Sequence, residues 1–233
     1  MIRGILKEIK SHKNENRAKN LFWFFKTGKG EYGEGDIFWG LNVPTSRKIA
    51  LKYKDIPLSE INLLLKYKVH EVRLIGILVL VHRYEQGTAE EKEKIVKFYL
   101  KNTKYINNWD LVDLSAPKIL GEYLLQEKNP EKILLKLAKS KNLWEQRIAI
   151  ISTFAFIQEG NTKWTLEIAK MFLKHDHDLI HKATGWMLRE AGKKDVKKLC
   201  QFLDVNIYHM PRTMLRYAIE KFPENVRLAY LRK

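Results

Sequence analysis

Apolar residues recur three and four positions apart through most of this 233-residue chain, and this spacing constrains the fold more than any other feature. It is the spacing of a helix that buries one face. No comparable series of alternating residues, which would predict strands, occurs beside it. The pattern predicts helices at residues 69–84, 90–101, 109–126, 130–138, 143–159, 164–175, 179–191, 196–203 and 211–222.

The connections between these helices are short and contain residues that break or cap helices. Gly87-Thr88, Asn129-Pro130 and Gly160-Asn161 are examples. Short connections make neighbouring helices antiparallel.

A repeat underlies the helical pattern. Basic residues occur at one phase of successive apolar helices, in His70 to Arg73, at Arg147, at Lys182 and at Arg216, and Asp113 lies near the same phase. Their separations are about 35 residues or twice that, in the range where helix pairs stack. The sequence therefore predicts an all-α fold, an α-solenoid of HEAT-like helical repeats with a concave basic groove. We expect it to form a single domain over residues 1–233.

The composition indicates the kind of partner. The chain has 43 Lys and Arg against 27 Asp and Glu, a net charge of +16, which favours a polyanionic partner. The longest strongly apolar run, residues 74–81, is too short to span a bilayer, and the N-terminus is charged throughout. We therefore expect a cytoplasmic protein with no membrane partner. The single cysteine, Cys200, excludes an internal disulfide and is interpreted as a small core residue.

Three short stretches each place a tryptophan beside a charged residue at helical spacing. Trp109 lies four residues before Asp113, Trp144 three before Arg147, and Lys182 four before Trp186. Core packing is the ordinary interpretation of a lone tryptophan. Three such pairs at one phase of successive repeats instead favour an aromatic and charged surface of the kind that holds sugars, bases and phosphates.

The two carboxylates near Trp109 have different interpretations. Asn108 is placed to cap a helix, so Asp110 would lie in its first turn and is assigned to structure. Asp113 has apolar neighbours, and a carboxylate there needs a partner or a function. A structural ion pair with Arg147 and a catalytic role both remain open.

Two other motifs resemble sites for a metal ion or a phosphate, but neither has the features that such a site needs. His175-Asp176-His177-Asp178, with His181 nearby, resembles a metal cluster, but it falls at a loop and a helix start where Asp acts as a cap. Gly28-Lys29-Gly30 lacks the Ser or Thr and the strand of a phosphate loop. We predict neither a metal nor another cofactor.

Six motifs occur in a particular order and spacing along nearly the whole chain: Phe38 to Arg47, His70-Glu71-Val72-Arg73, Trp109-Asp110-x-x-Asp113, Trp144-x-x-Arg147, Lys182 to Glu190 and Met210 to Glu220. In these motifs, taken together, the chain resembles the AlkD-type DNA alkylation-repair glycosylases, which are built from HEAT-like repeats.

The resemblance implies roles for individual residues. Trp109, Asp113 and Trp186 match the family's catalytic positions, and Arg147 matches its arginine at the DNA surface. Members excise positively charged N3- and N7-alkylated purines from duplex DNA without inserting the lesion into a base pocket. The implied protein is a monofunctional DNA glycosylase, and we expect it to act as a monomer. Further DNA contacts are expected from the tryptophan and basic side chains of the same motifs: Trp144, Lys182, Arg189 and Arg216.

The residue chemistry agrees with this reaction. A cationic alkylpurine leaves without a general acid, and the remaining deoxyribose has oxocarbenium character. Asp113 would stabilise that cation or orient water, while Trp109 and Trp186 would flank the sugar and Arg147 would hold a phosphate.

The sequence leaves one alternative open, a non-catalytic HEAT-repeat module that binds structured DNA or a protein partner. One group of relatives has lost excision and altered its N-terminal DNA-contacting region. The role of residues 27–36 in this chain is accordingly left open. The presence of all four matched residues favours the enzyme.

Overall fold

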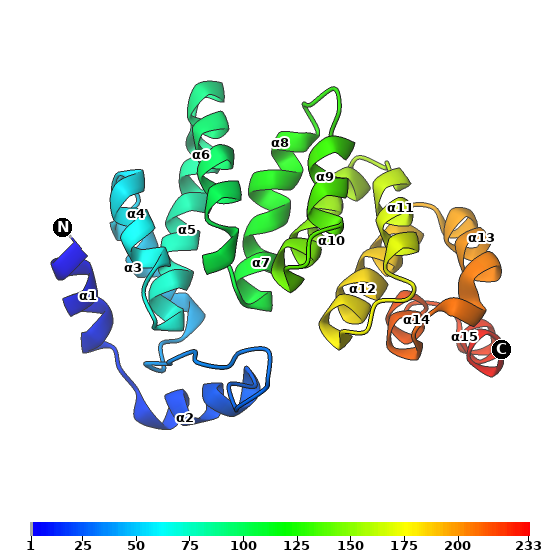
Figure 1. Cartoon of the computed structure of the whole chain (residues 1–233), viewed down its shortest axis with the longest axis horizontal. Coiled ribbons are helices and arrows are strands. Elements are labelled where there is room, and N and C mark those ends of the chain that lie inside the picture. The colour runs from blue at the N-terminus through cyan, green and yellow to red at the C-terminus, as the bar shows by residue number, and fades with distance from the viewer. Residues whose placement is uncertain (1) are drawn as a thin grey trace. The chain divides into compact units, whose positions relative to one another are not determined.

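The computed structural model describes residues 2–233 and is helical over 72% of the chain (Figure 1). Within residues 2–233 there is no strand, and the one extended pairing is an isolated bridge between Ile37 and Val69. The predicted all-α fold class, built from stacked helices as in an α-solenoid, is confirmed. The chain divides into two compact units, one ending at Ser115 and one from Ala116 to Lys233. The expected single domain over residues 1–233 stays a prediction.

Unit 1 is arranged around one central helix, α5 (His70–Gln86), which packs against α3 (Val43–Lys52), α4 (Leu58–Leu65) and α6 (Ala89–Lys101) (Figure 1). Most residues of α5 are buried on all sides, as expected for a helix surrounded by others. The other elements are α1 (Ile2–Ser11), α2 (Glu15–Phe24), a short 3₁₀ turn (Thr103–Tyr105) and α7 (Trp109–Ala116).

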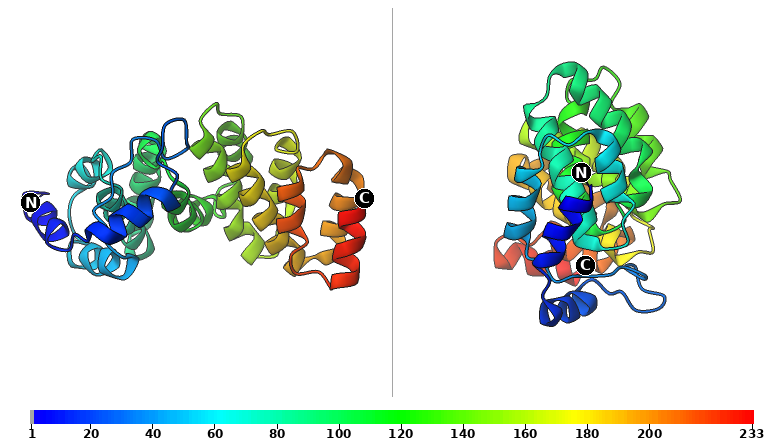
Figure 2. Two further views of the ribbon diagram at one scale, coloured as in Figure 1. Left: turned by 90° about the horizontal axis from the view of Figure 1, so that it is seen from below. Right: turned by 90° about the vertical axis from the view of Figure 1, so that its left-hand side faces the viewer.

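Helix α2 lies to one side of the other helices of unit 1 (Figure 2). None of its residues is buried. Helices α1 to α4 were not predicted from the sequence. Helix α2 buries no face and therefore has no apolar period to detect, whereas α1, α3 and α4 are short helices that each bury two or three residues.

Unit 2 consists of two layers of helices. One layer contains α10 (Leu143–Gln158), α12 (Asp178–Lys194) and α14 (Arg212–Ala218), with α12 packed against both others. The second contains α9 (Glu131–Ala138), α11 (Lys163–Met171) and α13 (Val196–Asn206), which pack on the first layer. A 3₁₀ turn (Ile207–His209) and α15 (Glu224–Arg232) complete the unit.

The prediction of one continuous α-helix over residues 109–126 was wrong, because the helix is interrupted. A π-helical segment (Pro117–Gly121) separates α7 from α8 (Glu122–Leu124). Proline lacks the N–H that an α-helical hydrogen bond needs. Gly121 approaches α10 so closely that a Cβ would lie 2.5 Å from the Ser152 carbonyl oxygen. The wider turn is therefore coupled to packing on α10.

Two predicted helices are shorter in the structure. The helix expected to reach residue 175 ends at Met171, and the one expected to reach residue 222 ends at Ala218. In the first case the chain enters a turn in which the His175 N–H donates to the Phe172 carbonyl oxygen at 3.1 Å.

No helix among residues 2–233 is long and apolar enough to cross a membrane.

Candidate functional site

The start of α7 is fixed by side-chain hydrogen bonds. Asn108 is buried, and its Oδ1 accepts a hydrogen bond from the Trp109 N–H at 2.8 Å. The Val112 N–H donates to the Asn108 carbonyl oxygen at 3.2 Å, so the helix begins at this residue. Asp110 Oδ1 accepts from the Leu111 N–H at 2.9 Å, which gives this carboxylate a structural role. Trp109 and Asp113 thus project from an anchored helix start.

A buried charged group, which we call the His70 cluster, lies behind this helix start. Its members are His70, Asp36, Asp110, Arg73 and Asn108. The His70 Nε2 lies 2.8 Å from Asp110 Oδ2, and its Nδ1 lies 3.2 Å from Asp36 Oδ2. Asp36 also accepts hydrogen bonds from Arg73 Nη2 at 2.6 Å and from Asn108 Nδ2 at 3.2 Å. The cluster joins α5, α7 and the segment before residue 40.

The two carboxylates determine the charge of His70. Burial disfavours the imidazolium, but Asp110 and Asp36 outweigh it and raise the pKa of His70 to about 9. For Asp36, burial opposes ionisation, yet His70 and Arg73 hold the pKa of its carboxyl below the usual value. At neutral pH the cluster therefore contains an imidazolium and a guanidinium against two carboxylates.

Glu71 fixes the neighbouring loop from the same turn of α5. Its buried carboxylate accepts hydrogen bonds from three consecutive backbone N–H groups, those of Trp39 at 3.1 Å, Gly40 at 2.6 Å and Leu41 at 3.1 Å. Gly40 has φ +82°, and a Cβ there would lie 2.0 Å from the Asn14 carbonyl oxygen. The motifs at residues 38–47 and 70–73 thus have a common structural purpose.

The indole of Trp109 packs on an aromatic group that the sequence analysis did not identify. The Trp109 and Phe25 rings stack with centroids 5.3 Å apart, and Phe24 contacts Trp109 edge-on at 5.8 Å. Phe25 is itself in contact with His70 at 4.9 Å and with Phe38 at 5.1 Å. The run of aromatic residues at positions 22–25 was the available signal. Trp109 is half-buried, so part of its ring system remains accessible.

Asp113 lies one turn beyond Trp109 and is half-buried. Fully buried Tyr99 is close enough to sense its charge: burial, and then the Asp113 carboxylate, raise the pKa of the Tyr99 phenol. The Tyr99 hydroxyl lies 2.9 Å from Ser115 Oγ, which donates to the Leu111 carbonyl oxygen at 2.6 Å. Tyr99 therefore remains protonated and donates to Ser115.

In unit 2, Trp144 and Arg147 lie inside the helix layers. Trp144 is 8% exposed and Arg147 is 5% exposed. Arg147 Nη1 donates to the Leu179 carbonyl oxygen at 2.6 Å, linking α10 to the start of α12. Arg147 therefore has a structural function in unit 2. The DNA contacts expected of both residues stay predictions.

The other expected DNA-binding residues of unit 2 lie on α12 and α14. Lys182 Nζ is 2.7 Å from Asp178 Oδ2, and Arg189 pairs with both Glu190 and Glu220. Trp186 is half-buried and Arg216 is exposed. Lys182 and Arg189 are thus both partnered by carboxylates, which a phosphate would have to displace. Their expected roles stay predictions.

Gly185 explains part of the motif that precedes Trp186. A Cβ at Gly185 would lie 2.5 Å from both the Met214 carbonyl oxygen and Tyr217 Cβ. The glycine therefore allows α12 and α14 to approach closely, which determines where Trp186 sits on unit 2.

The histidine-rich turn before α12 is explained by ordinary hydrogen bonds. His175 Nε2 pairs with Gln146 Oε1 at 2.9 Å, and His177 Nδ1 accepts from the Leu179 N–H at 3.1 Å. Burial lowers the pKa of both imidazoles, which agrees with His177 accepting as a neutral ring. Over residues 2–233, no group of three or more His, Cys, Asp or Glu side chains is arranged to hold a metal ion.

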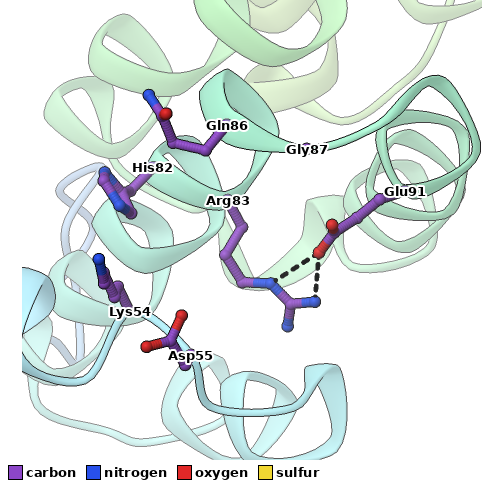
Figure 3. A pocket seen from close by; sticks show the side chains of 7 residues that line it. All are labelled: Lys54, Asp55, His82, Arg83, Gln86, Gly87 and Glu91. Carbon is purple, nitrogen blue, oxygen red and sulfur yellow. Dashed lines mark hydrogen bonds and ion pairs between the residues drawn. The ribbon is translucent and has the colours of Figure 1, made fainter.

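A polar pocket of about 300 Å³ lies elsewhere in unit 1, where the ends of α3, α5 and α6 meet (Figure 3). Arg83 extends across it, donating to Glu91 Oε1 through Nε at 3.1 Å and to the Ile56 carbonyl oxygen at 2.8 Å. These bonds join α5 and α6 to the segment between α3 and α4, so we interpret the pocket as a structural junction.

Comparisons with known proteins agree with the fold and with the sequence motifs. The family model described as "DNA alkylation repair enzyme" matches residues 5–222. A solved structure from Enterococcus faecalis, titled a predicted DNA alkylation repair enzyme, superimposes with a TM-score of 0.73 at 16% sequence identity. The match covers 91% of this chain and 98% of that one. No curated protein matches the sequence.

Proposed function

The chain belongs to the family of DNA alkylation repair enzymes, and from that premise we propose that it is a monofunctional DNA glycosylase. The proposed substrate is a positively charged N3- or N7-alkylated purine in duplex DNA. The observation that carries the proposal is the pair of Trp109 and Asp113, one turn apart on a helix whose start is held by the buried His70 cluster.

The proposed chemistry follows from the charge of the lesion. A cationic purine is already a good leaving group, so the enzyme needs to stabilise the positive charge that develops on the deoxyribose. The Asp113 carboxylate provides the opposite charge and can orient the attacking water, an assistance worth roughly a hundredfold to ten-thousandfold.

The indoles have an electrostatic role in this proposal. The face of an indole attracts a cation by about 0.5–2 kcal/mol. Trp109 is proposed to offer one face of its indole to the cationic sugar while Phe25 stacks on the ring and supports it. We assign Trp186 the same kind of contact with the sugar. Because its support is aromatic and the cluster behind it is buried, Trp109 needs little rearrangement before reaction.

Binding of the DNA is assigned mainly to phosphate contacts. The net charge of +16 favours a polyanion, and no base-reading motif is present in the sequence. Arg147 is proposed to contribute positive potential at the DNA surface while it supports α12. Trp144, Lys182, Arg189 and Arg216 are proposed as further contacts.

The test is release of free methylated purine from alkylated duplex DNA, measured in single turnovers with wild-type protein and with Asp113→Asn. We expect wild type to release base and the variant to be at least tenfold slower, at unchanged melting temperature and duplex affinity. Asn keeps the size of the side chain and removes only its charge. Duplex binding without release by wild type would refute the enzyme and support a non-catalytic DNA-binding module. A lower melting temperature that accounts for the slower release would make Asp113 structural.

A further inference from the structure

Helix α2 exposes three consecutive aromatic side chains. Phe22 is 41%, Trp23 77% and Phe24 63% exposed. Isolated apolar residues on a surface need no explanation, but a contiguous apolar patch indicates a binding site. Because α2 buries none of its residues, these rings do not serve the core of unit 1.

A hollow of about 370 Å³ lies beside this patch, within unit 1. Phe22 and Trp23 line it from α2, and Ile37 and Phe38 line it from the loop that Glu71 fixes. This volume falls within the range of ligand pockets. We call the hollow and its rings the α2 pocket.

The charges around the α2 pocket favour an anionic ligand. Lys19 lines the pocket and precedes Phe22 and Trp23 by three and four residues, so its ammonium shares their helix face. Asp36 also lines the pocket, but its carboxylate is bonded to Arg73 and His70. The accessible charge is therefore cationic.

The two residues that follow the rings of the α2 pocket in the sequence contact the proposed catalytic indole. Phe24, the next residue after Trp23, contacts Trp109 edge-on, and Phe25 stacks on Trp109. A polymer that reaches Trp109 therefore also reaches the C-terminal end of the helix that carries Phe22 and Trp23.

We propose that the α2 pocket binds an unstacked nucleobase of a DNA strand, with Phe22 and Trp23 against the ring and Lys19 on a flanking phosphate. Both faces of a base are covered by its neighbours in an intact duplex, so only a base that has left the stack offers the face that this site requires. A base opposite an excised lesion has lost its pairing partner, so it can leave the stack at a lower cost than a paired base. The identity of the polymer rests on the proposed function.

The experiment uses the full chain and a single-stranded oligonucleotide containing 2-aminopurine, whose fluorescence falls on stacking. Trp23→Ala is compared with Tyr208→Ala, a matched control because Tyr208 is 78% exposed and lies on unit 2. We expect Trp23→Ala to weaken binding by about fivefold to 150-fold, the contribution of one stacked base, and to remove the fluorescence change. Tyr208→Ala should bind like wild type.

A second variant tests the phosphate contact. Lys19→Gln should reduce the slope of log affinity against log salt by about 0.7, the value for one phosphate of a single strand. Equal binding by wild type and Trp23→Ala would overturn the proposal. The proposal would also be overturned if wild type were a dimer in solution and Trp23→Ala a monomer, because the exposed rings would then form a contact between two copies of the chain.

The outcomes separate this inference from the enzyme assignment. Loss of oligonucleotide binding in Trp23→Ala, in a protein that releases no methylated purine, would support the α2 pocket and refute the glycosylase. If wild type releases methylated purine but Trp23→Ala binds the oligonucleotide as well as wild type does, the glycosylase would be supported and the α2 pocket refuted.

Discussion

The imidazolium of His70 should make the stability of this protein fall as pH rises above neutrality. The perturbation is deprotonation of a side chain that is 2% exposed, lies between two carboxylates and faces the guanidinium of Arg73. Its folded pKa of about 9 is raised above the ordinary value of 6.5. A group with a raised folded pKa stabilises the native state fully below the unfolded pKa, and this contribution disappears as pH rises through the folded pKa.

The size of the effect follows from the two pKa values. A difference of about 2.5 pKa units corresponds to about 3 kcal/mol of stability, most of which is lost between pH 6.5 and 9. The carboxyl of Asp36 has a lowered pKa, so it titrates far below this window. The pKa values of His175 and His177 are lowered, so these two side chains titrate at the acidic end of this pH range or below it. Their titration makes stability rise with pH, which is opposite to the effect of His70.

Urea unfolding followed by circular dichroism, at intervals from pH 6.5 to 9, measures this loss. The matched variants are His70→Gln, which removes the titrating group, and His82→Gln, which alters a less buried histidine on the same helix α5. We expect His70→Gln to be less stable at pH 6.5 and to lose the pH dependence, while His82→Gln retains it. A wild-type stability that is flat across the window, or an equal decline in wild type and His70→Gln, would refute the reasoning.

Three further predictions concern DNA binding and packing. Affinity for duplex DNA should fall steeply with salt, with a log–log slope of about −0.9 per phosphate contacted; a flat response in a filter-binding or anisotropy titration would argue against phosphate-driven binding. Arg147→Ala should lower the free energy of unfolding by about 1.5–3 kcal/mol, because it leaves the Leu179 carbonyl without its charged donor. It should also weaken duplex binding, and weaker binding at unchanged stability would assign Arg147 to DNA alone. Gly185→Ala should destabilise by about 1–3 kcal/mol in urea unfolding, since its Cβ would clash with α14. Gly4→Ala, which meets nothing within 4 Å, is the control, and equal effects of the two would contradict the packing argument.

Beyond residue 69 the sequence predicted most of the helices that bury an apolar face, but it missed α1 and α4, which also bury apolar residues. Helices α5, α6 and α9 to α12 begin within two residues of the predicted positions. In contrast, the π-helical segment depends on Gly121 meeting α10, a contact between residues about 30 positions apart that no local pattern encodes. Helix α2 escaped prediction because its aromatic residues face outward.

The candidate site was predictable where its residues are close in sequence. Asn108, Trp109 and Asp110 could be placed at a helix start from local spacing alone. The pairing of Lys182 with Asp178, one turn earlier on the same helix, was not predicted although its spacing is local. The pairing of His70 with Asp36 and Asp110 spans 34 and 40 residues, and it required the fold to bring three segments together.

Asp110 and Asp113 show how one short helix can hold two carboxylates in different roles. The charge of Asp110 is matched within unit 1 by a buried imidazolium, so its contribution is to the position of α7. Asp113 lies one turn from Trp109 on the same helix. Together with burial, its carboxylate raises the pKa of the Tyr99 phenol, which stays protonated. Because His70 compensates the charge of Asp110 inside unit 1, the start of α7 is held by a neutralised buried group, and Asp113 projects one turn further along the same anchored helix.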